Sequence, residues 1–282
     1  SDALRTAHEA CQPEVVKLSM RLGQSVPIFR SLEALRAGTE WGQLDGAQRR
    51  IVETLLRDAR LSGVALEGSE KERFNEIQLE LAELSTRFSN NVLDSTKAFA
   101  LTLTDSAEIE GLPRSLHELA AQNAREAGDE SATPEAGPWR ITLDYPSFVP
   151  FLEHSRRRDL REKLYRAYIM RASSGELDNR SVLERTLELR GEAARLLGYQ
   201  TYAEVSLASK MAPDVAAVER LLEELRRVSL GAAQREFDEL AAFAREQGGV
   251  GASVSAQVRD EQKRLSRLRS GGGSESIAGL RK

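Results

Sequence analysis

The sequence predicts a mostly α-helical protein, a multi-helix domain with one small two-stranded antiparallel β element. Over long stretches apolar residues recur every three or four positions, the spacing that places them on one face of a helix. Two short segments instead alternate apolar and polar residues, as half-buried strands do. The 282 residues are 40% hydrophobic and 30% charged. The chain therefore has enough apolar residues for a sizeable core and enough charge for a solvated surface.

The two longest helices are expected at residues 70–94 and 213–247. In the first, the apolar positions are Phe74, Ile77, Leu81, Leu84, Phe88 and Val92. Pro213 suits the first turn of the second helix, and Gly248 and Gly249 suit a helix stop. Shorter helices are expected near residues 13–22, 45–62, 115–127, 156–171, 179–197 and 201–209.

Residues 99–104 and 139–144 are the two predicted strands. Each alternates apolar residues with polar ones, and turn residues bound it. We expect the two to pair antiparallel as a small sheet around the helix that connects them. Residues 128–137 are polar, with two prolines nearby, and are expected to form an exposed loop.

Residues 156–198 contain two charged amphipathic segments separated by the polar break Ser173-Ser174-Gly175. Asp178 and Asn179 follow the break, and both residue types cap helix N-termini well. On physical grounds alone, this region is expected to be a helix–turn–helix hairpin without chemistry of its own.

Bulk properties exclude several classes of protein. The net charge of −4 and a pI near 5.7 argue against nucleic acid as a partner of the whole protein. A single cysteine excludes an internal disulfide framework. We expect no membrane association, because no apolar run approaches the roughly 20 residues that span a bilayer. Residues 1–16 include acidic residues and have no apolar core, which argues against a signal or transit peptide there.

The histidines do not form a metal site in the sequence. A His-Glu-x-x-His zinc site places two imidazoles on one helix face, with a glutamate that activates the metal-bound water. Here His8, His117 and His154 are far apart, and Cys11 cannot replace a ligand set. We therefore expect no catalytic residue, no metal ligand and no cofactor within this chain.

Two further groups of residues have both a functional and a structural interpretation. The basic residues Arg156, Arg157, Arg158, Lys163, Arg166 and Arg171 suggest an oxyanion site. The neighbouring acids Glu153, Asp159 and Glu162 favour a solvated, ion-paired helix face instead. The tyrosines Tyr165, Tyr168, Tyr199 and Tyr202 suit either a peptide channel or the edge of a core, and we favour the core edge.

Two more groups of residues are unlike a catalytic base or a phosphate-binding loop. His154 follows an apolar run and has no serine or cysteine nucleophile beside it, so we expect it to cap or pack rather than act as a base. Gly191 and Gly198 belong to neither of the usual phosphate-binding glycine patterns.

Several stretches of the chain, in order, resemble one family. They include QPEVVKLSMRLGQS, NVLDSTKAF, GPWRITLDYPSFVPFLEH and REKLYRAY followed by RASSGELDN and LLGY. These look like the N-terminal helical region of the thimet/oligopeptidase A (M3) family of zinc metallopeptidases. The likeness is greatest to the plant organellar oligopeptidases, and it covers about residues 1–247.

The resemblance implies one wall of a deep peptide channel, facing short peptides and a zinc domain that lies C-terminal to these residues. Zinc is implied for the complete enzyme only. We thus expect part of a metalloendopeptidase that degrades short peptides and is not catalytic alone. Its expected partners are short peptides or the missing catalytic domain, and a concave, partly apolar face is expected to be uncovered. The alternative is a self-contained, non-catalytic peptide-binding or scaffold protein derived from that family. The resemblance suggests the chloroplast stroma or mitochondrial matrix, with the cytoplasm as an alternative.

Residues 248–282 depart from the family pattern and are expected to be a flexible tail. Between Arg259 and Arg269 there are five basic and two acidic residues, and Gly271 to Ser274 resembles a linker. A basic tail for an acidic partner or RNA is the functional interpretation. We favour a disordered end or an altered transcript, because short charge runs are usually solvated.

Overall fold

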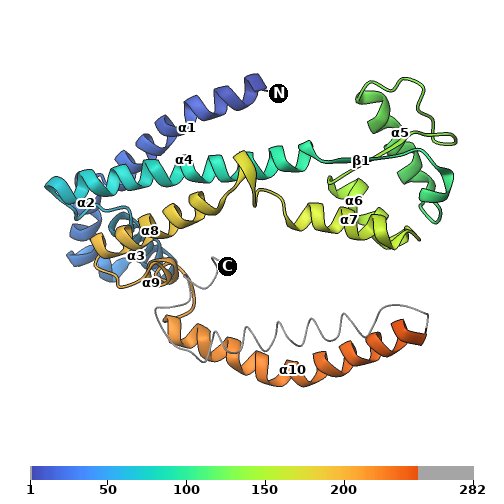
Figure 1. Ribbon diagram of the computed structural model, residues 1–282. Helices are drawn as coiled ribbons and strands as arrows, with labels where there is room; N and C mark the ends of the chain where they lie inside the picture. The colour runs from blue at the N-terminus through green and yellow to red at the C-terminus, as the bar shows by residue number, and fades with distance from the viewer. Residues whose placement is uncertain (1, 247–282) are drawn as a thin grey trace. The chain divides into compact units, whose positions relative to one another are not determined.

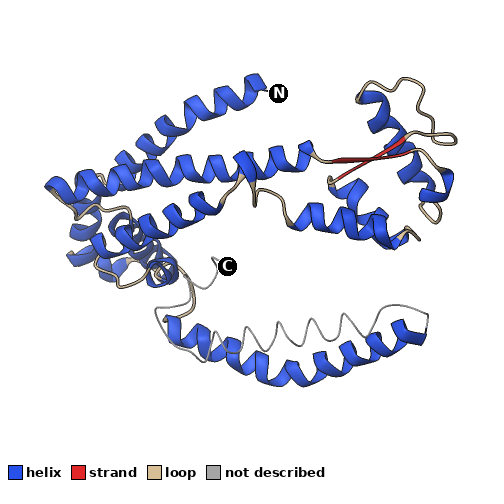
Figure 2. Cartoon of the chain, in the orientation of Figure 1, coloured by secondary structure: helices blue, strands red, loops and turns tan. Residues whose placement is uncertain are grey.

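The computed structural model describes residues 2–246 (Figure 1). Residue contacts divide the chain into two units, residues 1–209 and 210–282, and each is considered by itself. The first unit contains α1 (Asp2–Gly23), α2 (Val26–Ala37), α3 (Gly46–Leu61), α4 (Gly68–Ala98), β1 (Ala100–Leu103), α5 (Arg114–Glu126), β2 (Trp139–Thr142), α6 (Tyr145–His154), α7 (Arg158–Ile169), α8 (Arg180–Leu196) and α9 (Tyr202–Leu207). Short 3-10 turns lie at Thr39–Gln43, Ser106–Glu108 and Gly175–Leu177. The described part of the second unit contains α10 (Val215–Glu246), and helices dominate throughout, as predicted (Figure 2).

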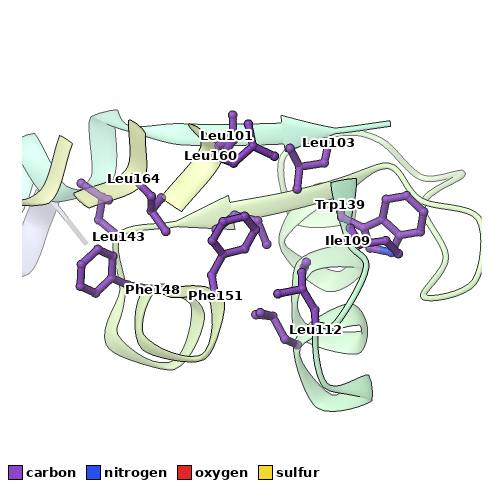
Figure 3. Packing of buried hydrophobic residues seen from close by; sticks show 13 residues of the cluster. Leu101, Leu103, Ile109, Leu112, Trp139, Leu143, Phe148, Phe151, Leu160 and Leu164 are labelled. Atoms are coloured by element: carbon purple, nitrogen blue, oxygen red, sulfur yellow. The ribbon is translucent and has the colours of Figure 1, made fainter. Parts of the chain in front are cut away.

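The two strands pair antiparallel, as the alternating pattern predicts. Leu101 lies opposite Ile141 and Leu103 opposite Trp139, so all four side chains point to one face of the sheet. This face is buried against α5, α6 and α7 in what we call the sheet cluster (Figure 3). The cluster comprises Leu101, Leu103, Ile109, Leu112, Leu116, Ala120, Trp139, Ile141, Leu143, Phe148, Phe151, Leu160 and Leu164.

A second core, the α4–α8 cluster, lies along the N-terminal half of α4. Phe74 and Ile77 of α4 pack there against Leu189 and Ala193 of α8, and all four are almost fully buried. At about 1.5 Å per residue, the 31 residues of α4 span roughly 46 Å. Because β1 begins directly after α4, this one helix runs from the α4–α8 cluster to the sheet cluster (Figure 1).

The expected helix–turn–helix hairpin is not formed, although both of its helices are. α7 packs on α6, whereas α8 packs on α4. The apolar face of α7 carries Leu160 and Leu164 into the sheet cluster, and that of α8 carries Leu189 and Ala193 into the other one. The two helices therefore separate after the break instead of folding back on each other.

Prolines account for differences at two helices. Pro13 lies inside α1, so the helix expected at residues 13–22 is the second half of a longer one. Proline lacks the N–H that would bond the carbonyl of Glu9, yet the helix continues on both sides. α6, which the periodicity does not predict, contains Pro146 in its first turn and Pro150 inside.

The predicted loop at residues 128–137 is largely exposed, but one end is fixed to the core. Thr133 and Gly137 exchange two backbone hydrogen bonds, and the indole N–H of Trp139 donates to the carbonyl of Pro134 at 3.0 Å. Gly137 has φ +74°, and a Cβ there would lie 2.8 Å from the Trp139 ring. Only glycine fits this conformation and this close approach.

Candidate functional site

The three histidines are placed on three different helices. His8 lies exposed on α1, and His154 lies exposed in the last turn of α6, so of its two expected roles, capping or packing, packing is not observed. His117 on α5 lies near Trp139, with ring centroids 6.3 Å apart, and its buried Nε2 has no hydrogen-bond partner in the described residues. Within residues 2–246, no group of three His, Cys, Asp or Glu side chains is arranged to hold a metal.

The basic segment at the start of α7 is ion-paired, as the sequence favours. The pairs are Arg156 with Glu110, Arg157 with Asp159, and Arg166 with Glu162. Arg157 donates two hydrogen bonds to Asp159, at 3.0 and 2.7 Å, and these bonds lower the pKa of Asp159 to about 2. Glu153 lies beside His154 instead, with 3.9 Å between Oε2 and Nε2. An oxyanion site at this triplet is thus not supported, because Arg156 and Arg157, two of its three arginines, have intramolecular carboxylate partners.

The four tyrosines do not converge on one surface. Tyr168 stacks on Phe148 of the sheet cluster, with ring centroids 4.1 Å apart, and the Arg171 guanidinium lies 3.6 Å from its centroid. This confirms the core-edge interpretation for Tyr168. Tyr165 is 52% exposed on α7, and Tyr202, with Arg190 4.9 Å from its centroid, is exposed on α9. Tyr199 is partly buried in the turn before α9.

Two bidentate ion pairs, which we call the α4–α8 clamp, hold α4 against α8. Arg73 of α4 donates to both carboxylate oxygens of Glu192 at 2.7 and 2.9 Å. Arg185 of α8 donates in the same way to Glu80 at 2.6 and 3.0 Å. Seven residues separate the two clamp positions on each helix, so the pairs repeat after two helical turns of an antiparallel packing. The clamp fixes the register of the helices beside their shared core.

The clamp should make stability depend on pH. The hydrogen bonds from Arg185 and Arg73 lower the pKa values of Glu80 and Glu192 below the usual 4.5. A carboxylate whose pKa is lower in the folded state than in the unfolded state stabilises the fold at pH values above the unfolded-state pKa. This stabilisation is lost as the pH falls through the folded-state pKa. Both carboxylates are about one-third exposed, so we expect roughly 1 kcal/mol per pair at pH 7.

Urea unfolding of the Arg73→Met/Arg185→Met double variant between pH 7 and pH 2.5 checks this. The variant should be less stable than the parent above about pH 4.5, and the difference should shrink as the pH falls further. Arg114→Met removes an exposed pair within α5 and is the matched control, expected to change stability by less than about 0.5 kcal/mol. A difference that stays constant down to pH 2.5 would contradict the assignment.

The loop at residues 170–179, which we call the anchoring loop, is bonded to the C-terminal half of α4. The amide of Ala172 donates to Ser95 Oγ at 3.1 Å, and Arg171 Nη1 donates to Thr96 Oγ1 at 3.0 Å. Ala172 is buried with φ +51°, a left-handed conformation that is costly for a residue with a Cβ. The surrounding hydrogen bonds therefore hold this turn in place.

Asn179 ends the anchoring loop, and its side chain does not cap α8 as expected. It is 3% exposed and bonds to α4 instead. Its Nδ2 donates to the Phe88 carbonyl at 3.1 Å, and its Oδ1 accepts from Asn91 Nδ2 at 2.9 Å. Asp178 instead bonds to the start of α8, because its Oδ1 accepts from the backbone N–H of Arg180 at 2.9 Å.

A cleft of about 330 Å³ lies between α1 and α4, and both charged and apolar side chains line it. Its lining residues are Glu9, Gln12, Pro13, Leu79, Ala82, Glu83, Thr86, Arg87, Asn90 and Asn91. None of these was singled out from the sequence as a site residue. One signal in the sequence could have indicated them: the amide residues Gln12, Asn90 and Asn91 lie within segments whose apolar spacing predicts helices.

Two family models match the chain. "Neurolysin/Thimet oligopeptidase, N-terminal domain" matches residues 1–71, and "Peptidase family M3" matches residues 151–261. The chain is also 50% identical over 247 residues to the probable cytosolic oligopeptidase A of Arabidopsis thaliana. The chain belongs to peptidase family M3. The second match continues past the boundary expected at residue 247, which itself lies outside the described residues.

Other M3 relatives are similar over the same extent. The chain is 51% identical over 247 residues to organellar oligopeptidase A, chloroplastic/mitochondrial, of Arabidopsis thaliana, and 37% identical over 255 residues to oligopeptidase A of Escherichia coli. These matches cover 88% and 89% of this chain but 31% and 36% of the two relatives. The chain therefore spans about a third of the length of the M3 oligopeptidases that it matches.

M3 peptidases are zinc enzymes, so the described residues can be tested for a zinc site. His8, His117 and His154 lie on α1, α5 and α6, and the side chain of His117 packs near Trp139. Structural and catalytic zinc sites need three or four converging nitrogen, sulfur or oxygen ligands. The described residues do not fit such a site. No helix among them is long and apolar enough to cross a membrane.

Proposed function

We propose that this chain is a peptide-facing channel wall of a zinc-dependent M3 oligopeptidase that degrades short peptides, and that it does not cleave peptides by itself. The similarity to oligopeptidases over 88% of the chain, but only 35% of the first relative's length, carries this proposal. The sequence supplies no His-Glu-x-x-His motif. The zinc ligands and the general base are then contributed by residues outside this chain.

Exposed apolar side chains support a wall that receives other surfaces. α7 exposes Tyr165 and Ile169, and α8 exposes Leu183 and Leu187, each pair one helical turn apart. Leu187 is 62% exposed, although Leu189 two residues later is fully buried. Large exposed apolar groups that repeat along helices are typical of surfaces that contact peptides or other domains. The proposed partners are therefore short peptides and the catalytic domain of the same enzyme.

The proposed location follows the names of the relatives. One Arabidopsis thaliana relative is described as cytosolic and another as chloroplastic/mitochondrial. We place the protein in the chloroplast stroma or mitochondrial matrix, with the cytoplasm as the alternative. Imaging of the protein with a C-terminal fluorescent tag, expressed from its full transcript, distinguishes the three.

A chimera tests the wall role. In E. coli oligopeptidase A, the segment that this chain matches is exchanged for the corresponding residues of this chain. We expect the chimera to cleave an internally quenched peptide within about tenfold of the parent enzyme, because the catalytic centre is retained and the wall has the same fold. This chain alone should give only background cleavage.

Two results would count against the proposal. A chimera that folds, as judged by circular dichroism and a cooperative melt, yet binds no peptide would show that these residues do not form the wall. Chelator-sensitive cleavage by this chain alone, in a preparation free of other proteases, would show that the chain carries its own catalytic centre.

A further inference from the structure

A second cleft, which we call the basic cleft, lies between the C-terminal part of α1 and the N-terminal part of α4 and has a volume of about 450 Å³. Its charged lining residues are Lys17 and Arg21 of α1 and Lys71 of α4, and no carboxylate belongs to the lining that the structure describes. Met20 and Leu79 add apolar surface. The basic cleft therefore differs from the basic segment at the start of α7, which is ion-paired.

Two of the three cations have no partner. Neither Arg21 nor Lys71 forms an ion pair or a side-chain hydrogen bond with another residue of the described part. Lys17 pairs with Glu14 at 2.8 Å, but the two side chains are 55% and 72% exposed, and such a pair contributes at most about 1 kcal/mol. An anion with several charges can therefore displace Glu14 at little cost.

Buried amides fix one wall of the basic cleft. Gln24 is 8% exposed, and its Nε2 donates to the carbonyl of Ser62 at 2.9 Å and to Asn75 Oδ1 at 2.7 Å. Asn75 also lines the cleft, and because its oxygen is the acceptor, its Nδ2 remains as a donor. This Nδ2 makes no hydrogen bond within residues 2–246. The wall thus adds N–H donors to the three cations.

The cations are spread along the cleft. Relative to the bonded pair of Gln24 and Asn75, Lys17 lies seven residues back along α1, and Lys71 lies four residues back along α4. Because the two helices run antiparallel, these displacements add to eleven residues, about 16 Å of helix rise. Arg21 lies between these two positions. The arrangement therefore suits an elongated anion better than a compact one.

We propose that the basic cleft binds a linear polyphosphate, either free or as the phosphate chain of a nucleotide. Ammonium and guanidinium groups are common partners of phosphate oxygens, and phosphates joined in a chain match cations that follow one direction. A concave site with three cations favours a small anion over a nucleic acid or an anionic membrane, since the whole chain carries a net charge of −4. The inference does not depend on peptide cleavage.

Calorimetric titration of the full chain with sodium tripolyphosphate, at low ionic strength and without divalent cations, tests the proposal. We expect a dissociation constant on the order of 0.1 mM, because several charge-assisted contacts act together. Orthophosphate and citrate reach fewer of the cations at once and should bind at least about tenfold more weakly.

Adenosine triphosphate distinguishes the two sources of the phosphate chain. Tighter binding than that of tripolyphosphate identifies a nucleotide as the ligand, because its base then covers the apolar surface of Met20 and Leu79. Equal or weaker binding identifies the free polyphosphate.

Paired variants locate the site. Arg21→Met/Lys71→Met removes the two cations without partners and should weaken tripolyphosphate binding at least about tenfold. Arg50→Met/Lys97→Met is the matched control, because it removes one arginine and one lysine from exposed positions on α3 and in the last turn of α4. It changes the net charge equally and should alter the affinity by less than about twofold.

The following results would overturn the assignment. They are no binding at about 5 mM tripolyphosphate, equal affinity for orthophosphate or citrate, tighter binding of tetraglutamate than of tripolyphosphate, and an unchanged affinity in a folded Arg21→Met/Lys71→Met variant. An equal loss of affinity in the control variant would show a response to net charge alone and would likewise exclude the basic cleft.

Discussion

Leu189→Ala should lower the free energy of unfolding by about 2–5 kcal/mol, the range for truncating a buried leucine and leaving a cavity. Leu189 is fully buried among Phe74, Ile77 and Ala193, where α8 packs on α4. The loss removes apolar contacts from the smaller of the two cores, which has few other side chains to collapse into the space. Urea unfolding followed by circular dichroism at 222 nm measures the effect.

Leu187→Ala is the matched control, because it makes the same chemical change on the same helix. Leu187 is 62% exposed, so its truncation should change the free energy of unfolding by less than about 0.5 kcal/mol. Equal effects of the two substitutions would contradict the orientation of α8 described above, in which Leu189 faces α4 and Leu187 faces away. A larger effect of Leu187→Ala would mean that this side chain is covered, by a second copy or by residues outside the described part.

Asn179→Ala should destabilise the first unit through the groups that it leaves unpaired. The Phe88 carbonyl and the Asn91 amide would each lose a buried partner, at roughly 1–3 kcal/mol apiece. Ser174→Ala, in the same loop and exposed, is the control and should be nearly neutral. Thermal and urea unfolding measure the difference.

Hydrogen exchange of the Asn179→Ala variant adds a local observation. We expect faster exchange in the anchoring loop and in the turns of α4 around Phe88 and Asn91, because this amide pair joins them. If the variant loses less than 0.5 kcal/mol and its exchange is unchanged, the buried amide pair does not fix the loop.

Sequence periodicity predicts the elements whose buried faces are long. α4 and the two strands are placed within a few residues, because their apolar spacing persists for several turns or alternates cleanly. α2 was missed, and it has no buried residue that would produce a periodic core pattern. Val26 and Ile28 in α2 are exposed instead. α2 is therefore helical although it lacks the buried apolar face from which periodicity predicts a helix.

The tertiary contacts around the anchoring loop were not predictable from spacing. Asn179 is a good N-cap by residue type, but partners about 90 positions away on α4 use its side chain. The absence of the expected hairpin was also not predictable, because the sequences of α7 and α8 do not indicate that their apolar faces pack in different cores. The candidate cleft also depends on pairing α1 with α4, whose hydrogen-bonded residues lie 81 and 89 positions apart.

The anchoring loop brings together the two points where residues 99–169 join the rest of the first unit. The chain leaves at the end of α4 and returns at Arg171 and Ala172, which are bonded to Thr96 and Ser95. A segment with adjacent ends and its own core, the sheet cluster, has the architecture of an insertion. We therefore expect a change in the length of residues 99–169 to leave the path of α4 and α8 unchanged.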